Sequence, residues 1–222
     1  MTRALYDGVA EWYDEKIAPF GLEATDAIRS FLGRGQGRCL DLGCGTGLHL
    51  PTVIELGWSV TGLDISRDQL RLARGRVGDE VELVLADATA VPFPDETFDA
   101  VLSAFTHTDV DDFEGLLREA ARVLRAGGKL VYVGLHPCFI GPHSRFVAAE
   151  GVPELHAGYR GRRRYREAPG VSPEGLRAKV GAVHVPLDEL IQSFLDTGFE
   201  LERFAEVGAR VYPAVIALRA RR

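Results

Sequence analysis

Three aspartates stand where chemistry could be done, because each closes a short apolar run of the kind that forms a buried strand. They are Asp41, Asp64 and Asp87. Carboxylates at the carboxyl ends of adjacent parallel strands can accept hydrogen bonds from the ribose hydroxyls of a bound nucleoside. The three acids surround one ligand with acceptors and offer no fixed cation for a pyrophosphate. They therefore suit a nucleoside that carries positive charge.

Glycines at every second position follow the first of these acids, where residues 38–50 read RCLDLGCGTGLHL. They are Gly43, Gly45 and Gly47. A dinucleotide fingerprint needs G-x-G-x-x-G, and the third position after Gly45 is Leu48, which weakens a nicotinamide interpretation. The pattern G-x-G-x-G lets the backbone turn tightly and approach a ligand closely at the end of a strand. A tight turn alone would also explain the glycines, but their combination with Asp64 and Asp87 favours a ligand.

The elements that must position these residues alternate between strand and helix. Strands are expected at CLDLG, WSVTGLD, VELVLAD, FDAVLSAF and KLVYVGL, with helices at 48–56, SRDQLRLARGR and FEGLLREAARVLR. This alternation predicts a parallel sheet covered on both faces. A helix in PLDELIQSFLDTGF and two strands, FELERFAEV and VYPAVIALRA, follow. The predicted fold is α/β, a Rossmann-like, seven-stranded, mostly parallel sheet with helices on both faces, an antiparallel last strand pair, and a helical and loop cap.

Two further segments would supply that cap. Amphipathic spacing predicts a helix over 6–17 and another after it, so residues 1–32 form an N-terminal helical cap. Residues 136–183 hold five prolines, many glycines and the basic run RGRRRYR at 160–166, a composition usual for a lid or binding loop. A chain with 46% hydrophobic content and 222 residues can bury one substantial core. We therefore expect a single domain over 1–222 with both segments as its cap.

Charge and cysteine content limit the partners and the compartment. A formal net charge of -6 makes the surface a poor partner for phosphate backbones or anionic membranes, so we expect a small-molecule partner, no nucleic acid and no membrane. The three cysteines, Cys39, Cys44 and Cys138, form no C-x-x-C pair and have no histidine at zinc-finger spacing. We expect reduced thiols, no metal site, a cytoplasmic location without a secretion signal or membrane span, and a monomer or homodimer.

With these motifs, the chain resembles class I S-adenosylmethionine-dependent methyltransferases of the small-molecule type found in ubiquinone and menaquinone biosynthesis. The segments that carry the resemblance are DLGCGTG, TGLDIS, LADAT, PFPDETFD, RAGGKL and YDGVAEWYD. The resemblance covers nearly the whole chain and is weakest over 141–182. Ala126 departs from the family, which usually has proline before the two glycines, and this affects only the rigidity of that turn.

The resemblance implies S-adenosyl-L-methionine as the cofactor and S-adenosyl-L-homocysteine as its product. It implies that Gly43 and Gly45 pass close to the methionine part and that Asp41 orders their loop. Ser103 would meet the cofactor's amino group through its carbonyl. Tyr13 would close over the methionine end, although an aromatic residue on a helix can equally belong to the core.

The same resemblance assigns the nucleoside part of the cofactor to the next two strand ends. Asp64 would hold the ribose hydroxyls and Ile65 would pack on the adenine. Asp87, with the backbone of Ala88, would face the adenine edge. Tyr6 is a weaker candidate for closing over the methionine end.

Histidines are the candidate proton acceptors. In-line methyl transfer depends on holding the acceptor atom, the methyl carbon and the sulfur in a line, and a positioned histidine can also remove a proton from the acceptor. His107 and His136 follow the fourth and fifth strands and are predicted to be catalytic, with Asp109 among the acids that would orient His107. His143 and His184 are predicted to bind the substrate. The alternatives are helix capping around His107 and a simple turn at His136.

The basic run at 160–166 allows an acidic or phosphorylated acceptor, or an RNA path in which Tyr159 and Tyr165 stack on bases. We favour a solvated lid surface that stays mobile until a ligand orders it. The predicted function is S-adenosylmethionine-dependent methyl transfer by in-line displacement to an oxygen, carbon or nitrogen of a small molecule. Two alternatives stay open: a protein that uses the cofactor structurally for a non-methylating reaction or regulatory binding, and an RNA methyltransferase.

Overall fold

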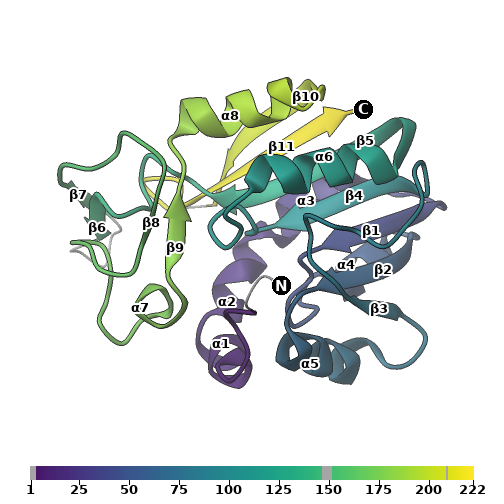
Figure 1. Cartoon of the computed structure of the whole chain (residues 1–222), viewed down its shortest axis with the longest axis horizontal. Coiled ribbons are helices and arrows are strands. Elements are labelled where there is room, and N and C mark those ends of the chain that lie inside the picture. The colour runs from purple at the N-terminus through teal and green to yellow at the C-terminus, as the bar shows by residue number, and fades with distance from the viewer. Residues whose placement is uncertain (1–3, 147–151, 209) are drawn as a thin grey trace.

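The computed structural model describes residues 4–146, 152–208 and 210–222, and a seven-stranded sheet forms its centre (Figure 1). The strands are β1 (Arg38–Leu42), β2 (Ser59–Asp64), β3 (Glu82–Leu85), β4 (Phe98–Ala104), β5 (Leu124–Leu135), β10 (Glu200–Val207) and β11 (Val215–Arg221). Their order is β10-β11-β5-β4-β1-β2-β3. Strand β11 runs antiparallel to both β10 and β5, and the other adjacent pairs are parallel. The predicted fold class, including the antiparallel last pair, is confirmed.

Helices cover both faces of the sheet because both faces of the central strands are apolar. On one face lie α3 (Thr25–Leu32), α4 (Leu50–Glu55) and α5 (Arg67–Val77), and on the other lie α6 (Phe113–Val123) and α8 (Leu187–Asp196). Helix α6 shows the sequence logic: Phe113, Leu116, Leu117 and Ala120 recur at helical spacing and are buried. Asp112 caps this helix by accepting a hydrogen bond from the Gly115 amide at 2.8 Å. The capping fixes the segment that joins β4 to α6.

The N-terminal segment forms α1 (Ala10–Lys16), α2 (Ala18–Gly21) and the 3-10 turn η1 (Leu22–Ala24) before α3 begins. The helix predicted over 6–17 is shorter, because Gly8 adopts a φ of 80°, in the left-handed region, and separates Tyr6 from α1. Helix α1 packs against α5, and its Trp12 ring receives the Lys179 ammonium 4.9 Å from its centroid. The N-terminal segment therefore contacts the segment predicted to be a lid.

Residues 136–183 contain more regular structure than their composition predicts. Strand β6 (Ser144–Phe146) pairs antiparallel with β7 (Pro153–Leu155), β8 (Arg163–Tyr165) pairs antiparallel with β9 (Ala182–His184), and α7 (Leu176–Val180) precedes β9. Three-residue strands are too short to give an alternating pattern, so only the pairing with a distant partner creates them. Part of the basic run is thus a strand. Among the described residues, no helix is both long and apolar enough to cross a bilayer.

Candidate active site

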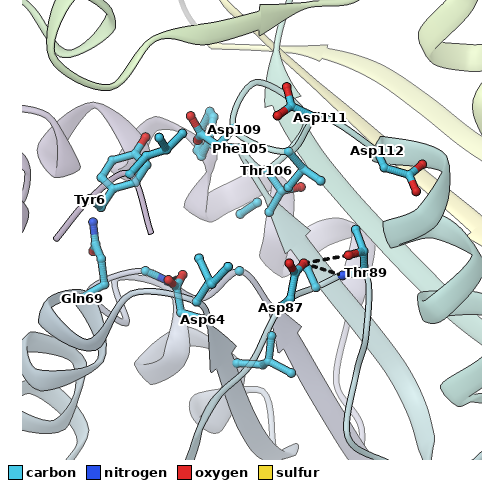
Figure 2. Close-up of a pocket in the computed structure, with 18 of the residues that line it drawn as sticks. Tyr6, Asp64, Gln69, Asp87, Thr89, Phe105, Thr106, Asp109, Asp111 and Asp112 are labelled. Carbon is cyan, nitrogen blue, oxygen red and sulfur yellow. Dashed lines mark hydrogen bonds between the residues drawn. The ribbon is translucent and has the colours of Figure 1, made fainter. Parts of the chain in front are cut away.

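A cavity of about 420 Å³ opens at the carboxyl ends of β1, β2 and β4 (Figure 2). One side, which we name the strand-end wall, consists of Gly43, Gly45, Asp64, Ile65, Gln69, Asp87 and Ala88. The opposite side, which we name the cap wall, consists of Tyr6, Asp109, Asp111, Arg164 and Arg166. Figure 2 shows Asp109 and Asp111 facing Asp64 and Asp87 across the opening. A cavity of this size at strand ends is where open α/β sheets bind their ligands.

The glycine loop is fastened to β2 through its backbone. The Gly43 amide donates to the Leu63 carbonyl at 2.8 Å, and the Gly45 amide donates to Asp64 Oδ2 at 2.9 Å. Gly43 has a φ of 82°, and a Cβ built on it would lie 2.5 Å from the Thr106 side chain. Both constraints require glycine there and bring the loop backbone to the cavity surface.

Asp64 joins the loop to the next helix. Its Oδ1 accepts the Ser66 amide at 2.9 Å, while Oδ2 holds Gly45. Burial raises the pKa of this carboxyl to about 6, although the backbone hydrogen bonds oppose the rise. Because each carboxylate oxygen has two lone pairs, the group retains acceptor capacity toward the cavity.

Asp41 lies behind the loop and is almost fully buried, so it does not line the large cavity but lines a smaller one beside it, together with Tyr13, Gly43 and Gly45. Burial, with a further contribution from Asp64, raises its pKa to about 7. Within the described residues, its Oδ1 has no hydrogen-bond partner. A buried acceptor of this kind fits a ligand that carries a positively charged donor at the glycine loop.

The other residues predicted to bind the cofactor are Asp87, Ala88, Ile65 and Ser103, and the first three lie at this wall. Asp87 Oδ1 accepts two hydrogen bonds from Thr89, from its amide at 3.0 Å and its hydroxyl at 2.8 Å, and this turn holds Asp87 and Ala88 at the surface. Ile65 lines the same region. Ser103 is buried below the surface, where its hydroxyl lies 2.6 Å from that of Thr106.

Tyr13 and Tyr6 both line the cavity and touch each other, with ring centroids 5.2 Å apart in an edge-to-face arrangement. Burial raises the pKa of Tyr13 to about 12. Both phenols are therefore neutral at physiological pH and act as hydrogen-bonding groups.

The two histidines predicted to be catalytic lie away from the cavity lining. His107 is buried, its Nδ1 lies 2.6 Å from the Tyr132 hydroxyl, and burial lowers its pKa to about 3. Its ring packs edge-on against Phe113 and Tyr132. His136 Nε2 lies 2.9 Å from Glu206 Oε1, and its ring packs on Phe139.

His143 and His184 lie beside each other in the cap, with ring centroids 5.3 Å apart. Each Nε2 meets a backbone carbonyl, that of Cys138 at 3.0 Å and that of Tyr159 at 2.6 Å. Neither residue lines the cavity described above. Among the described residues, no group of three or more histidine, cysteine or acidic side chains is arranged to hold a metal ion.

Three ion pairs lie at the cap wall or behind it, and the sequence analysis predicted none of these pairs. Arg177 of α7 pairs with Asp109, with Nη1 3.0 Å from Oδ1, and Arg164 of β8 pairs with Asp111 at 2.8 Å. A third pair joins Arg162 to Glu114 of α6 through two hydrogen bonds of 2.8 and 2.6 Å. The partners lie about fifty residues or more apart in the sequence, so no local pattern could have indicated them.

The comparison with known proteins agrees with this geometry. Residues 40–132 match the family model of a methyltransferase domain. A demethylmenaquinone methyltransferase of Tropheryma whipplei (strain Twist) is 36% identical over 162 residues, which are 69% of this chain and 67% of the relative. The chain belongs to the class I S-adenosylmethionine-dependent methyltransferases.

Solved structures of such methyltransferases share the whole fold. An S-adenosylmethionine-dependent methyltransferase from Mesorhizobium loti is 25% identical, with a TM-score of 0.71 over 97% of this chain and 99% of that one. A 1,6-didemethyltoxoflavin-N1-methyltransferase from Burkholderia thailandensis, solved with S-adenosylhomocysteine bound, is 18% identical, with a TM-score of 0.62 over 98% of this chain and 83% of that one. The cofactor of this methyltransferase is S-adenosylmethionine.

The polar groups at the strand-end wall and beneath it match the hydrogen-bond donors of that cofactor. The unpartnered oxygen of Asp41 suits the cofactor's ammonium group, and the carboxylate of Asp64 suits hydroxyl donors. The glycine loop allows the close approach that both contacts need.

Proposed function

We propose that the methyltransferase binds its cofactor along the strand-end wall and methylates a hydroxylated aromatic small molecule held against the cap wall. The observation that carries the proposal is the cavity itself, whose two walls place acceptors for a nucleoside opposite a second set of polar and aromatic groups. When bound, S-adenosylmethionine supplies an electrophilic methyl group on a sulfonium sulfur. The protein's contribution is to hold the acceptor atom in line with it.

The roles proposed for the strand-end wall follow from position. Asp64 accepts hydrogen bonds from the ribose hydroxyls, and Ile65 packs on the adenine. Asp87 and the Ala88 backbone face the adenine edge. Each of these residues lines the cavity, and Asp64 and Asp87 are held in place by local hydrogen bonds, which supports preorganised binding.

The methionine part of the cofactor would lie over Gly43 and Gly45, with Tyr13 covering it. Asp41 would accept from the ammonium group from below the loop. Ser103 adjoins Ala104, which lines the cavity, so its carbonyl remains the proposed acceptor at the end of β4.

An aromatic acceptor suits the cavity, because Tyr6 of the cap wall, Tyr13 and Phe105 line it together with the apolar Leu5 and Val110. Several curated relatives are named demethylmenaquinone methyltransferases. A reduced demethylmenaquinone is therefore the first acceptor to test. The net charge of -6 supports a small molecule over nucleic acid, and the free cysteines support a cytoplasmic location. We propose a monomer or homodimer, which gel filtration tests.

The predicted roles of the histidines stay predictions. The described contacts of His107 and His136 are with Tyr132 and Glu206, and these contacts favour a structural role. His143 and His184 are bound to cap carbonyls and would support the shape of the cap.

The test has two parts. Calorimetric titration with S-adenosylhomocysteine should show one site per chain. Incubation with S-adenosylmethionine and reduced demethylmenaquinone should then give a methylated product by mass spectrometry. Absence of S-adenosylhomocysteine binding would contradict the cofactor assignment, whereas binding without methylation would contradict only the acceptor class.

A further inference from the structure

Asp109 differs from the neighbouring acid of the cap wall, Asp111, in how far its side chain is buried. Its side chain is 24% exposed, toward the cavity, whereas that of Asp111 two residues later is 73% exposed. Helix α7 brings Arg177 to it, and Arg177 also donates to the Thr108 hydroxyl at 3.0 Å. This second bond fixes the guanidinium, which in turn fixes the orientation of the Asp109 carboxylate.

The carboxylate retains capacity for another donor. Arg177 donates one bond to Oδ1 and the Tyr6 hydroxyl is also hydrogen-bonded to the carboxylate, and these two bonds use only part of the lone pairs of an ionised carboxylate. Tyr6 stands beside it from the N-terminal segment, and Figure 2 shows Tyr6 and Asp109 on the same side of the cavity. A hydroxyl of a ligand lying between the walls would find this carboxylate within its reach.

The charged and titratable groups around Asp109 come from every element packed on it. They are Tyr6 from the N-terminal segment, Tyr13 from α1, Asp64 from β2, Arg164 and Tyr165 from β8, and Arg177 from α7. Burial, the largest influence, raises the pKa of Asp109, and the arginines oppose this rise without cancelling it. Such a carboxylate is a stronger proton acceptor than an aspartate on the surface.

His107, two residues before Asp109, is kept from contact with a ligand in the cavity by the side chains that pack around it. Its Nδ1 is engaged by Tyr132, and the ring is enclosed by Phe113 and Tyr132. Between them lies Thr108, whose hydroxyl binds Arg177. Of the four residues of the segment THTD, Thr106 and Asp109 line the cavity, and Asp109 is the one that carries a carboxylate.

We propose that Asp109 is a catalytic residue that accepts the hydroxyl proton of a phenolic or enolic acceptor, and that Arg177 is the residue that positions it. The O–H bond of the acceptor breaks, its electron pair stays on oxygen, and the proton passes to a carboxylate oxygen of Asp109, from which it later returns to solvent. The oxygen that keeps the electron pair becomes more nucleophilic, and conjugation extends this effect to ring carbon. The proposal rests on the function proposed above and names the chemical group that the site recognises.

The experiment uses 4-nitrophenol as the probe, because its phenol and phenolate forms absorb differently. The full-length protein is saturated with S-adenosylhomocysteine, and the probe is titrated with pH in the wild type, Asp109→Asn and Asp111→Asn. A nearby carboxylate disfavours the phenolate, so the apparent pKa of the bound probe should be higher in the wild type than in Asp109→Asn by about one unit. Asp111→Asn removes the same charge from the exposed neighbour and should give the wild-type value.

Calorimetry on the same samples separates the explanations. S-adenosylhomocysteine should bind Asp109→Asn within about threefold of the wild type, a difference below 1 kcal/mol, which also shows that the variant is folded. Asp109→Glu, which restores a carboxylate, should raise the probe's apparent pKa again. If the wild type binds S-adenosylhomocysteine but the probe does not bind or titrates alike in Asp109→Asn, the inference is wrong while the cofactor assignment stands. Loss of S-adenosylhomocysteine binding in Asp109→Asn alone would place Asp109 in the cofactor site and also overturn the inference.

Discussion

The two walls of the cavity are built in different ways. On the strand-end wall, Asp64 holds a loop that is 19 residues away in the sequence, and Asp87 holds the amide two residues after it. On the cap wall, Arg164 reaches Asp111 across 53 residues and Arg177 reaches Asp109 across 68. The first wall depends on backbone amides fixed by the sheet, and the second on pairs of long side chains.

From this difference we expect the cap wall to tolerate substitution more readily than the strand-end wall. Backbone donors keep their place whatever side chains surround them, so a binding site for a constant cofactor can rest on them. Side-chain pairs change with single substitutions, which suits recognition of an acceptor that differs between related enzymes. The predictions below test whether the two walls behave as separate units.

Asp64→Ala should give the largest effect. It removes the anchor of two loop amides together with the proposed ribose contact, so affinity for S-adenosylhomocysteine should fall about 100-fold. Calorimetry measures the change. Asp79→Ala, which removes a fully exposed carboxylate, is the control and should bind like the wild type. Unchanged affinity in Asp64→Ala would remove Asp64 from the cofactor site.

Asp41→Asn tests, through pH, the buried acid that lies beneath the glycine loop. Burial raises the pKa of Asp41 to about 7, above the ordinary value of about 3.9, so its contribution to stability is fully present below about pH 4 and is lost as pH rises through 7. The ligand-free wild type should therefore lose on the order of 2 kcal/mol relative to Asp41→Asn between pH 5 and pH 8. Urea unfolding at both pH values measures it. If the free energy of unfolding changed equally with pH in the wild type and in Asp41→Asn, Asp41 would be ionised in the folded protein at no cost in free energy.

Arg177→Met tests the ion pair between α7 and the segment that follows β4. It leaves the largely buried Asp109 carboxylate without its cation, and the free energy of unfolding should fall by about 2 kcal/mol. The double variant Asp109→Asn with Arg177→Met should recover part of this loss, because no unpaired charge remains. A double variant as unstable as the sum of the singles would show that the two side chains are not coupled.

His107→Phe tests whether His107 or Asp109, both in the segment THTD, accepts the proton of the acceptor. The Tyr132 hydroxyl loses its described partner, so stability should fall by about 1 kcal/mol. The titration of bound 4-nitrophenol should be unchanged, in contrast to Asp109→Asn. A shift of the probe's apparent pKa in His107→Phe would restore the predicted catalytic role of His107.

Arg162→Gln should have the smallest effect. Its pair with Glu114 is bidentate but somewhat more exposed than the pair of Arg177 with Asp109, so the cost should be about 0.5 kcal/mol and should shrink with added salt. Thermal unfolding at low and high salt measures it. A loss as large as that in Arg177→Met would mean that residues 152–184 are held to the rest of the chain as strongly through Arg162 as through Arg177.

The strand-end wall could largely be predicted from the sequence. Parallel strands must end at one edge, so Asp64, Asp87 and the glycines at 43 and 45 had to converge once the strands were recognised. Asp41 was predicted to order the loop, and the structure places it below the loop with one oxygen unpartnered. The family motifs fall on these same residues.

The cap wall needed the tertiary structure. The sequence indicated four histidines for the acceptor, but it could not show that His107 packs between Phe113 and Tyr132. The basic run read as a solvated surface, yet Arg164 lines the cavity and pairs with Asp111.

By itself, the sequence determined the strands and helices, the glycine loop and the acids at the strand ends, because hydrophobic periodicity, glycine geometry and the succession of elements along the chain are local properties. Only the tertiary structure decided which side chains of the acid-rich segment after β4 face the cavity and which arginines meet them. The physical reason is that an ion pair across 68 residues depends on how two distant segments fold against each other, and no short stretch of sequence encodes that.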